Sequence, residues 1–343
     1  METMHRYKTI DAHAAGEPLR LIVEGFPTPK GRTMLEKRAW VKAHADRIRR
    51  SLMQEPRGHL DMYGAVLTEP VSPEADAGVL FMHNEGYSTM CGHGIIAVTT
   101  IAIERSLIHP RQPGRVIFDA PAGLVRATAH IVPRKASKSD GGPETRVSSV
   151  SFVNVPSFVL HPGLAIEVGG RKIRLDVAFG GAFYAIVDAE AAGIPVLPSR
   201  LADLRRVGME IKHAVEAAVT VGHPDDRGLK GIYGTIFTGP PDREDADLKN
   251  VTVFADAEVD RSPCGTGTCA VMAVVDAMGL LAPDRPFRHE SIVGTVFSGR
   301  VVSRTRVGDY DAIVPELEGS AWITGEHTFV VEDDDPLGEG FRL

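Results

Sequence analysis

One eight-residue pattern occurs twice in this chain of 343 residues, and it strongly limits the folds that the chain can adopt. Residues 91–98 read CGHGIIAV and residues 264–271 read CGTGTCAV, so both follow the pattern C-G-x-G-x-x-A-V. The two copies lie about half the chain length apart, and Phe81 and Phe254 each stand ten residues before the cysteine. The repeat predicts two related halves that each deliver one cysteine at the same structural point, in a site where the two thiols face each other.

The length of the chain also favours two domains, because a single hydrophobic core rarely extends over so many residues. The polar stretch over residues 133–145 has the composition of a loop and marks the end of the first half. We therefore predict an N-terminal half over residues 1–147, which carries Cys91, and a C-terminal half over residues 148–343, which carries Cys264. The last strand of the chain can return to the N-terminal half.

Hydrophobic periodicity predicts many strands and a few helices. We expect helices over residues 33–53, with Thr33 as N-cap, and over residues 94–106, 200–219 and 264–278. Strand-rich halves with few helices indicate the α+β class rather than a doubly wound sheet. The expected strands cover residues 8–12, 19–23, 65–67, 78–82, 116–119, 123–131, 150–153, 173–178, 183–187, 233–237, 251–255 and 295–302.

Composition excludes several classes of function. The formal net charge of −7 argues against a nucleic-acid-binding protein. No apolar run approaches the ~20 residues that span a bilayer, and the N-terminus lacks the apolar core of a signal peptide. We expect a cytoplasmic protein without a membrane anchor.

Cysteine usage points to free thiols. Three cysteines are too few for a disulfide scaffold, although a single Cys91–Cys264 disulfide stays open as an alternative. The cysteines form no CxxC pair, so we predict no metal site. We interpret Cys269, inside the second motif, as a packing residue.

Each motif cysteine stands where a helix is expected to begin. The helix dipole and the unpaired amides at that position lower a thiol pKa, which makes the thiolate available as a base. The amides of Gly92, His93, Gly265 and Thr266 could in addition cradle a carboxylate. Two thiols on opposite faces of a carbon can remove a proton from one face and return one to the other without a cofactor, which is the chemistry of a racemase or epimerase, and a bell-shaped pH profile would follow.

Other interpretations of the motif remain. A Cys-Gly pair is often a small buried residue beside a turn, and a glycine-rich turn before a helix can bind phosphate. The second alternative is weak, because no Walker-type lysine follows and the glycines lack the dinucleotide-binding spacing. The duplication of the motif favours catalysis.

The chain resembles the proline racemase family from about Ile10 to its C-terminus. This family includes proline racemases, 4-hydroxyproline 2-epimerases and trans-3-hydroxy-L-proline dehydratases. The resemblance implies a diaminopimelate-epimerase type of fold, with two pseudo-symmetric halves that each wrap a curved sheet around a central helix. It is carried by residues 55–59 (EPRGH), 61–65 (DMYGA), 87–93 (YSTMCGH), 178–181 (AFGG) and 260–268 (DRSPCGTGT).

The resemblance also implies roles for individual residues. Cys91 and Cys264 match the two acid–base residues, and Asp260 matches the acid that receives the ring nitrogen of the substrate. Tyr63 and Phe254 match aromatic residues that lie against the pyrrolidine ring. The substrate-binding positions that follow the cysteines are Gly92, His93, Gly265 and Thr266. The implied partner is a small molecule, proline or hydroxyproline, with no cofactor, and a homodimer is possible. Taken by themselves, Asp260 could be a turn residue and His93 a packed histidine.

Two features depart from the racemase pattern. Ala14 and Ala15 stand where the family usually has Thr or Glu and Gly. Residues 83–89 (HNEGYST) and 332–337 (EDDDPL) resemble most the dehydratase branch, which usually has threonine at the position of Cys264. We give Cys264 more weight, because a second thiol serves inversion and dehydration does not need it. We therefore predict a racemase or epimerase, with the dehydratase as the alternative.

Overall fold

The computed structural model describes residues 4–134 and 145–342. The chain forms two compact units, one of residues 1–152 with 319–343 and the other of residues 153–318. Residues 319–343, which the main prediction placed in the second half, therefore group with the first unit. The predicted division after residue 147 falls inside a strand, and most of the loop predicted over residues 133–145 lies outside the described residues.

The first unit is a strongly curved sheet with one helix inside it. Strand β1 pairs on its two sides with β2 and β18, both antiparallel. The order then runs through β3, β4, β6, β7 and β8, with parallel pairs at β2–β3 and β4–β6. These strands are β1 (Met4–Ala14), β2 (Glu17–Glu24), β3 (Tyr63–Thr68), β4 (Ala77–His83), β5 (Tyr87–Ser88), β6 (Arg115–Ala120), β7 (Gly123–Pro133), β8 (Thr145–Val153) and β18 (Ala321–Glu332).

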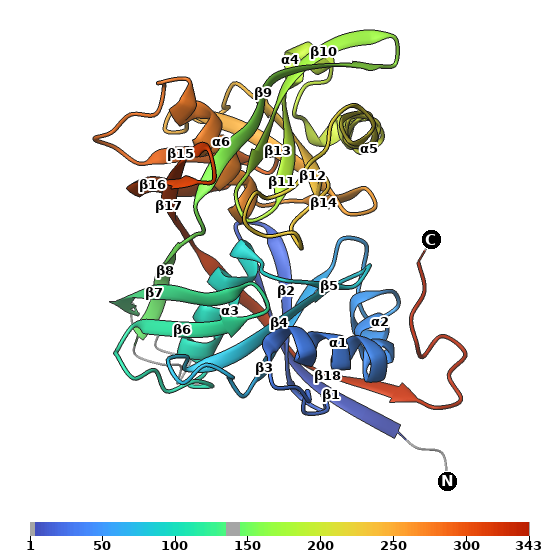
Figure 1. Cartoon of the computed structure of the whole chain (residues 1–343). Coiled ribbons are helices and arrows are strands. Elements are labelled where there is room, and N and C mark those ends of the chain that lie inside the picture. The colour runs from blue at the N-terminus through green and yellow to red at the C-terminus, as the bar shows by residue number, and fades with distance from the viewer. Residues whose placement is uncertain (1–3, 135–144, 343) are drawn as a thin grey trace. The chain divides into compact units, whose positions relative to one another are not determined.

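Helix α3 (Gly92–Glu104) is the central helix of this unit (Figure 1). Its residues from Gly92 to Ala102 are all buried, and it contacts β1, β2, β3, β7 and β18. Such all-round burial explains why the helix is apolar on every side instead of amphipathic. The sheet thereby fixes the position of the first motif cysteine, which directly precedes α3.

The helix expected over residues 33–53 is two helices, α1 (Met34–His44) and α2 (Asp46–Met53). Thr33 is confirmed as the N-cap, because its hydroxyl accepts a hydrogen bond from the Glu36 amide at 3.1 Å. The prediction of one continuous helix is wrong, since Ala45 has non-helical backbone angles (φ −131°, ψ 10°) and its amide closes the first helix on Val41.

The second unit repeats the plan of a sheet around a helix. Helix α6 (Gly265–Ala277) is its central helix and contacts β9, β10, β11 and β16. The strands are β9 (Ser157–Val168), β10 (Arg171–Phe179), β11 (Phe183–Asp188), β12 (Gly234–Gly239), β13 (Leu248–Phe254), β14 (Glu258–Asp260), β15 (Phe287–Ser291), β16 (Val296–Val307) and β17 (Tyr310–Gly319), and the other helical segments are α4 (Ala189–Ala192), η1 (Pro198–Arg200) and α5 (Leu201–Ala218).

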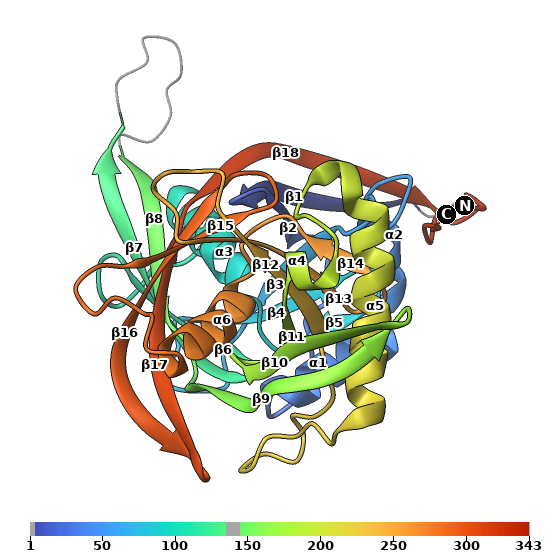
Figure 2. The ribbon, with the colours of Figure 1, turned by 90° about the horizontal axis from the view of Figure 1, so that it is seen from above.

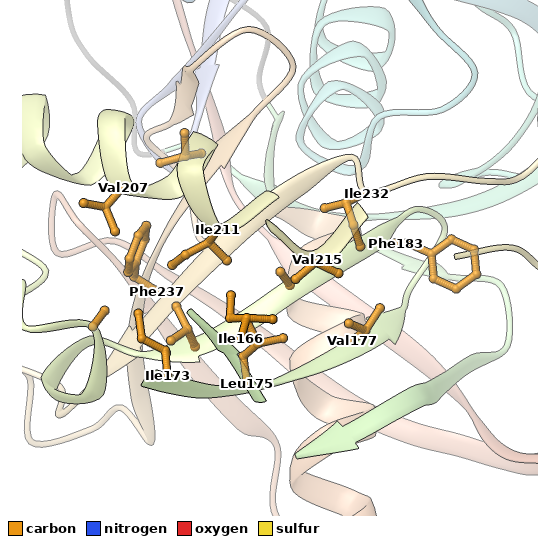
Figure 3. Packing of buried hydrophobic residues seen from close by; sticks show 14 of the residues in the cluster. Ile166, Ile173, Leu175, Val177, Phe183, Val207, Ile211, Val215, Ile232 and Phe237 are labelled. Atoms are coloured by element: carbon orange, nitrogen blue, oxygen red, sulfur yellow. The ribbon is translucent and has the colours of Figure 1, made fainter. Parts of the chain in front are cut away.

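Helix α5 covers the β9–β13 part of this sheet on the face that is turned away from α6 (Figure 2). Figure 3 shows Val207, Ile211 and Val215 of α5 directed toward Phe237 and the apolar side chains of β9 and β10. Their spacing of four residues places them on one face of the helix, as the periodicity predicted. The sheet of the second unit is thus held between α5 and α6, which makes the start of α6 a well-supported position.

All three cysteines are free thiols and all are buried, so the Cys91–Cys264 disulfide alternative is wrong. Within residues 4–134 and 145–342, no helix has the length and apolar character needed to cross a membrane.

Candidate active site

Cys91 caps the amino end of α3 with its side chain. Its backbone is extended (φ −147°, ψ 116°), and its Sγ accepts a hydrogen bond from the Gly94 amide at 3.2 Å. The first amides of a helix have no acceptor within the helix, so those of Gly92 and His93 are oriented toward the space beyond its end. A thiol and two N–H donors therefore converge at this point of the first unit.

The His93 ring lies against the Cys91 thiol. Its Nδ1 is 3.3 Å and its Nε2 is 3.4 Å from Sγ. Burial lowers the pKa of His93 to about 3, so this imidazole is neutral at neutral pH. The Tyr63 ring meets His93 edge-on at 4.7 Å, and its hydroxyl lies 2.7 Å from Ser88 Oγ. His93 and Tyr63 thus form the polar and aromatic wall beside the first thiol.

Cys264 caps α6 in the same manner. Its Sγ accepts a hydrogen bond from the Gly267 amide at 3.3 Å, which corresponds to the Gly94 bond in the first unit. Its backbone differs, because Cys264 has φ +64° in the left-handed region that non-glycine residues rarely adopt. Such a conformation costs about 1–3 kcal/mol and is typical of functional positions.

The prediction that a helix start lowers the thiol pKa is wrong for Cys264. Burial, and secondarily the nearby Asp260 carboxylate, raise the pKa of Cys264 to about 12. The Gly267 amide acts in the predicted direction but does not compensate for the loss of hydration. In the absence of a ligand, Cys264 is therefore a thiol rather than a thiolate at neutral pH.

Asp260 is connected to Cys264 through one serine. Its Oδ1 accepts hydrogen bonds from the Ser262 amide at 2.8 Å and the Ser262 hydroxyl at 2.6 Å. Ser262 Oγ in turn accepts from the Cys264 amide at 3.1 Å. Burial raises the pKa of Asp260 to about 6. Asp260 therefore organises a turn, as the alternative interpretation has it, and it is a buried carboxyl close to the Cys264 thiol.

Cys264, Asp260 and the first turn of α6 form the half-site of the second unit. Tyr184 belongs to this half-site, and the sequence analysis did not predict it. It lies on β11, and its hydroxyl is 2.6 Å from Thr266 Oγ1 and 3.7 Å from Cys264 Sγ. A sequence signal was available: the 178–181 segment that carries the family resemblance ends three residues before Tyr184. A Cβ atom on Gly180 would lie 2.2 Å from the Thr266 carbonyl oxygen, so this segment packs directly on the first turn of α6.

Phe254 joins the half-site through other aromatic rings. It stacks on Tyr233 at 5.5 Å, and Tyr233 meets Tyr184 edge-on at 5.8 Å. The structure therefore gathers Phe254, Asp260, Cys264, Gly265 and Thr266 in the second unit. In the first unit it gathers Tyr63 with the motif residues Cys91, Gly92 and His93.

The two alanines that depart from the racemase pattern lie at the turn between β1 and β2. Both are buried, and Ala15 has φ +50° with its amide bonded to the Ser320 carbonyl at 3.2 Å. Elsewhere, the described residues contain no group of three or more His, Cys, Asp or Glu side chains arranged to hold a metal ion.

A family model for proline racemase matches residues 9–342. The chain belongs to the proline racemase family. It is 49% identical to a trans-3-hydroxy-L-proline dehydratase of Bacillus cereus and 45% identical to a 3-hydroxyproline 2-epimerase of Burkholderia multivorans, each over the full length of both chains. The family is one of racemases and epimerases, with dehydratases among the relatives.

Solved structures confirm the predicted fold. A hydroxyproline epimerase from Agrobacterium vitis, with bound trans-4-hydroxy-L-proline, is 30% identical and has a TM-score of 0.84, covering 99% of this chain and 95% of that chain. A PhzF-family protein of Bacillus anthracis has a TM-score of 0.57 at 12% identity, over 94% of this chain and 99% of that chain, and shares the fold.

Proposed function

We propose that this protein is a cofactor-independent racemase or epimerase that inverts the α-carbon of proline or hydroxyproline, with Cys91 and Cys264 as its acid–base pair. The observation that carries the proposal is the matched capping of α3 and α6. In both units the cysteine Sγ accepts a hydrogen bond from the backbone amide three residues later in the chain. The two amides between them have no acceptor within the helix and lie next to the thiol.

Inversion requires one thiolate and one thiol. One cysteine takes the α-proton as the C–H bond breaks, and the electron pair moves into the carboxylate as an enediolate. The other cysteine then gives its proton to the opposite face of the carbon. Amides aimed at the developing charge are each worth about 3–4 kcal/mol, so those of Gly92, His93, Gly265 and Thr266 would hold the carboxylate throughout.

Asp260 is suited to the ring nitrogen of such a substrate. A secondary ammonium would pair with the buried carboxyl and favour its ionised form. The same cation would lower the pKa of Cys264, which opposes the effect of burial in the free protein. Tyr63 and Phe254 would pack against the pyrrolidine ring, one from each unit.

A second candidate is a trans-3-hydroxy-L-proline dehydratase, because a relative with that name is 49% identical over the whole chain. One thiolate would take the α-proton, a thiol of the pair would give a proton to the 3-hydroxyl so that it departs as water, and the resulting enamine would tautomerise to a pyrroline-2-carboxylate. Cys264 favours inversion over this reaction, since a thiol can reprotonate the carbanion and a threonine hydroxyl, with its far higher pKa, cannot do so readily.

Substitution of each thiol separates the two candidates. Cys91→Ser should abolish turnover while the protein stays folded, and Cys264→Thr should abolish inversion while sparing any dehydration. Cys269→Ala is the matched control, because Cys269 is buried and five residues into the motif. Substantial inversion by Cys91→Ser or by Cys264→Thr would overturn the two-thiol proposal.

A further inference from the structure

A chain of hydroxyl groups leads to the Cys264 sulfur. Thr266 Oγ1 and the Tyr184 hydroxyl are 2.6 Å apart, and the same Tyr184 hydroxyl is 3.7 Å from Cys264 Sγ. A phenol has one proton and can also accept a hydrogen bond. Thr266 can therefore donate to Tyr184 while Tyr184 donates to the sulfur.

Tyr184 is well suited to remain a donor. It is fully buried, and burial raises its pKa well above the usual value, so it keeps its proton over the working pH range. The strand β11 that carries it pairs with β10 and β12, which fixes the face of the sheet from which the Tyr184 side chain projects. In the first unit the Cys91 thiol lies against a neutral imidazole, that of His93.

We propose that Tyr184 is a positioning residue for Cys264: its hydroxyl donates a hydrogen bond to the Cys264 thiolate and is itself held by the Thr266 hydroxyl. The Thr266 side chain is then committed to Tyr184, and only its backbone amide serves the substrate carboxylate. This inference rests on the proposed function, because it requires Cys264 to pass through a thiolate.

Several groups surround the sulfur in the described part of the second unit. Asp260 of β14 opposes the thiolate by its charge, whereas the Gly267 amide of α6, the Tyr184 hydroxyl of β11 and the Thr252 side chain of β13 favour it. The positive charge of Arg261 lowers the pKa of Asp260. Tyr233 interacts electrostatically with Tyr184, and Cys269 does so with Cys264. Tyr184 and Thr252 are thus two side-chain donors that favour the Cys264 thiolate, and removal of the Tyr184 hydroxyl tests the first of them while Thr252 stays in place.

The test is the alkylation of Cys264 in the full-length protein. In a Cys91→Ser, Cys269→Ala background, Cys264 is the only thiol of the chain. The rate of its reaction with iodoacetamide at pH 9 is followed by intact-protein mass. The added substitution Tyr184→Phe removes the hydroxyl donor and keeps the aromatic ring. Tyr310→Phe is the matched control, because Tyr310 lies in the same unit and packs on Phe158.

The proposal expects Tyr184→Phe to react about 3–10-fold more slowly. Loss of a hydrogen bond to an anion raises the thiol pKa by about one to two units, and the greater nucleophilicity of the thiolate offsets part of that change. Tyr310→Phe should react at the rate of the background protein. A role in packing alone would expose the thiol and leave the rate equal or faster, and that result would overturn the proposal. Because alkylation needs no turnover, the outcome is independent of whether the two-thiol function holds.

Discussion

Cys264 and Asp260 of the second unit show how far burial changes the pKa of a side chain. The sequence predicted Cys264 and Asp260 as functional residues from the motif and the family resemblance. It predicted a low thiol pKa from the helix start alone, because the depth of burial is not visible in the sequence. Tyr184 was missed for a related reason, since its contact with Cys264 depends on how β11 lies beside α6.

Asp260 should destabilise the folded protein above its own pKa. Its folded pKa of about 6 lies above its ordinary value of 3.8, so the stability that it contributes is present below about pH 4 and is lost as pH rises through about 6. Asp260→Asn should therefore raise the free energy of unfolding at pH 8 by about 1–3 kcal/mol relative to the parent protein, and by about half as much at pH 5.

Urea unfolding at both pH values measures this difference, with the exposed Asp256→Asn as the control expected to stay within ~0.5 kcal/mol. The same Asp260→Asn protein should lose turnover by about 100-fold, because the substrate ammonium would lose its charge partner. Equal or lower stability of Asp260→Asn at pH 8 would contradict this view of Asp260.

At the scale of elements, apolar periodicity found α3, α5 and α6 to within two residues and most of the inner strands. It missed the short strands β5, β14 and β15, and also β9, β17 and β18, whose buried positions are separated by exposed and charged residues. In β9 the sequence His161-Pro162-Gly163 also interrupts the alternation. These strands are defined by their partners in the sheet, and that information is not local.

The packing of Gly180 on α6 gives a prediction for this scale. A Cβ on Gly180 would lie 2.2 Å from the Thr266 carbonyl oxygen and 2.5 Å from the Ala270 amide nitrogen, so the backbone of α6 must shift. Gly180→Ala should lower the free energy of unfolding by about 1–3 kcal/mol and impair turnover through Cys264.

Gly222→Ala is the matched control, because a Cβ there meets no atom within 4 Å. Its free energy of unfolding should change by less than ~0.5 kcal/mol. Denaturant unfolding and turnover of the two variants test the comparison, and a Gly180→Ala protein that matches Gly222→Ala in both would show that the contact does not position α6.

At the scale of the whole molecule, the duplicated motif predicted two halves, and each unit has a central helix that begins at a motif cysteine. We expect both thiols that act on a substrate to come from one chain. Cys91→Ser and Cys264→Ser proteins, co-expressed and purified together, should therefore show no inversion activity. Restoration to about a quarter of the parent rate would indicate a site shared by two chains.

The most direct test of the two-thiol account is proton NMR of the protein in D2O with L-proline, trans-4-hydroxy-L-proline and trans-3-hydroxy-L-proline, each supplied separately. We expect deuterium at the α-carbon of at least one of these together with the appearance of its inverted isomer. Conversion of trans-3-hydroxy-L-proline to a pyrroline carboxylate, without inversion of any of the three, would contradict the account and identify the protein as a dehydratase.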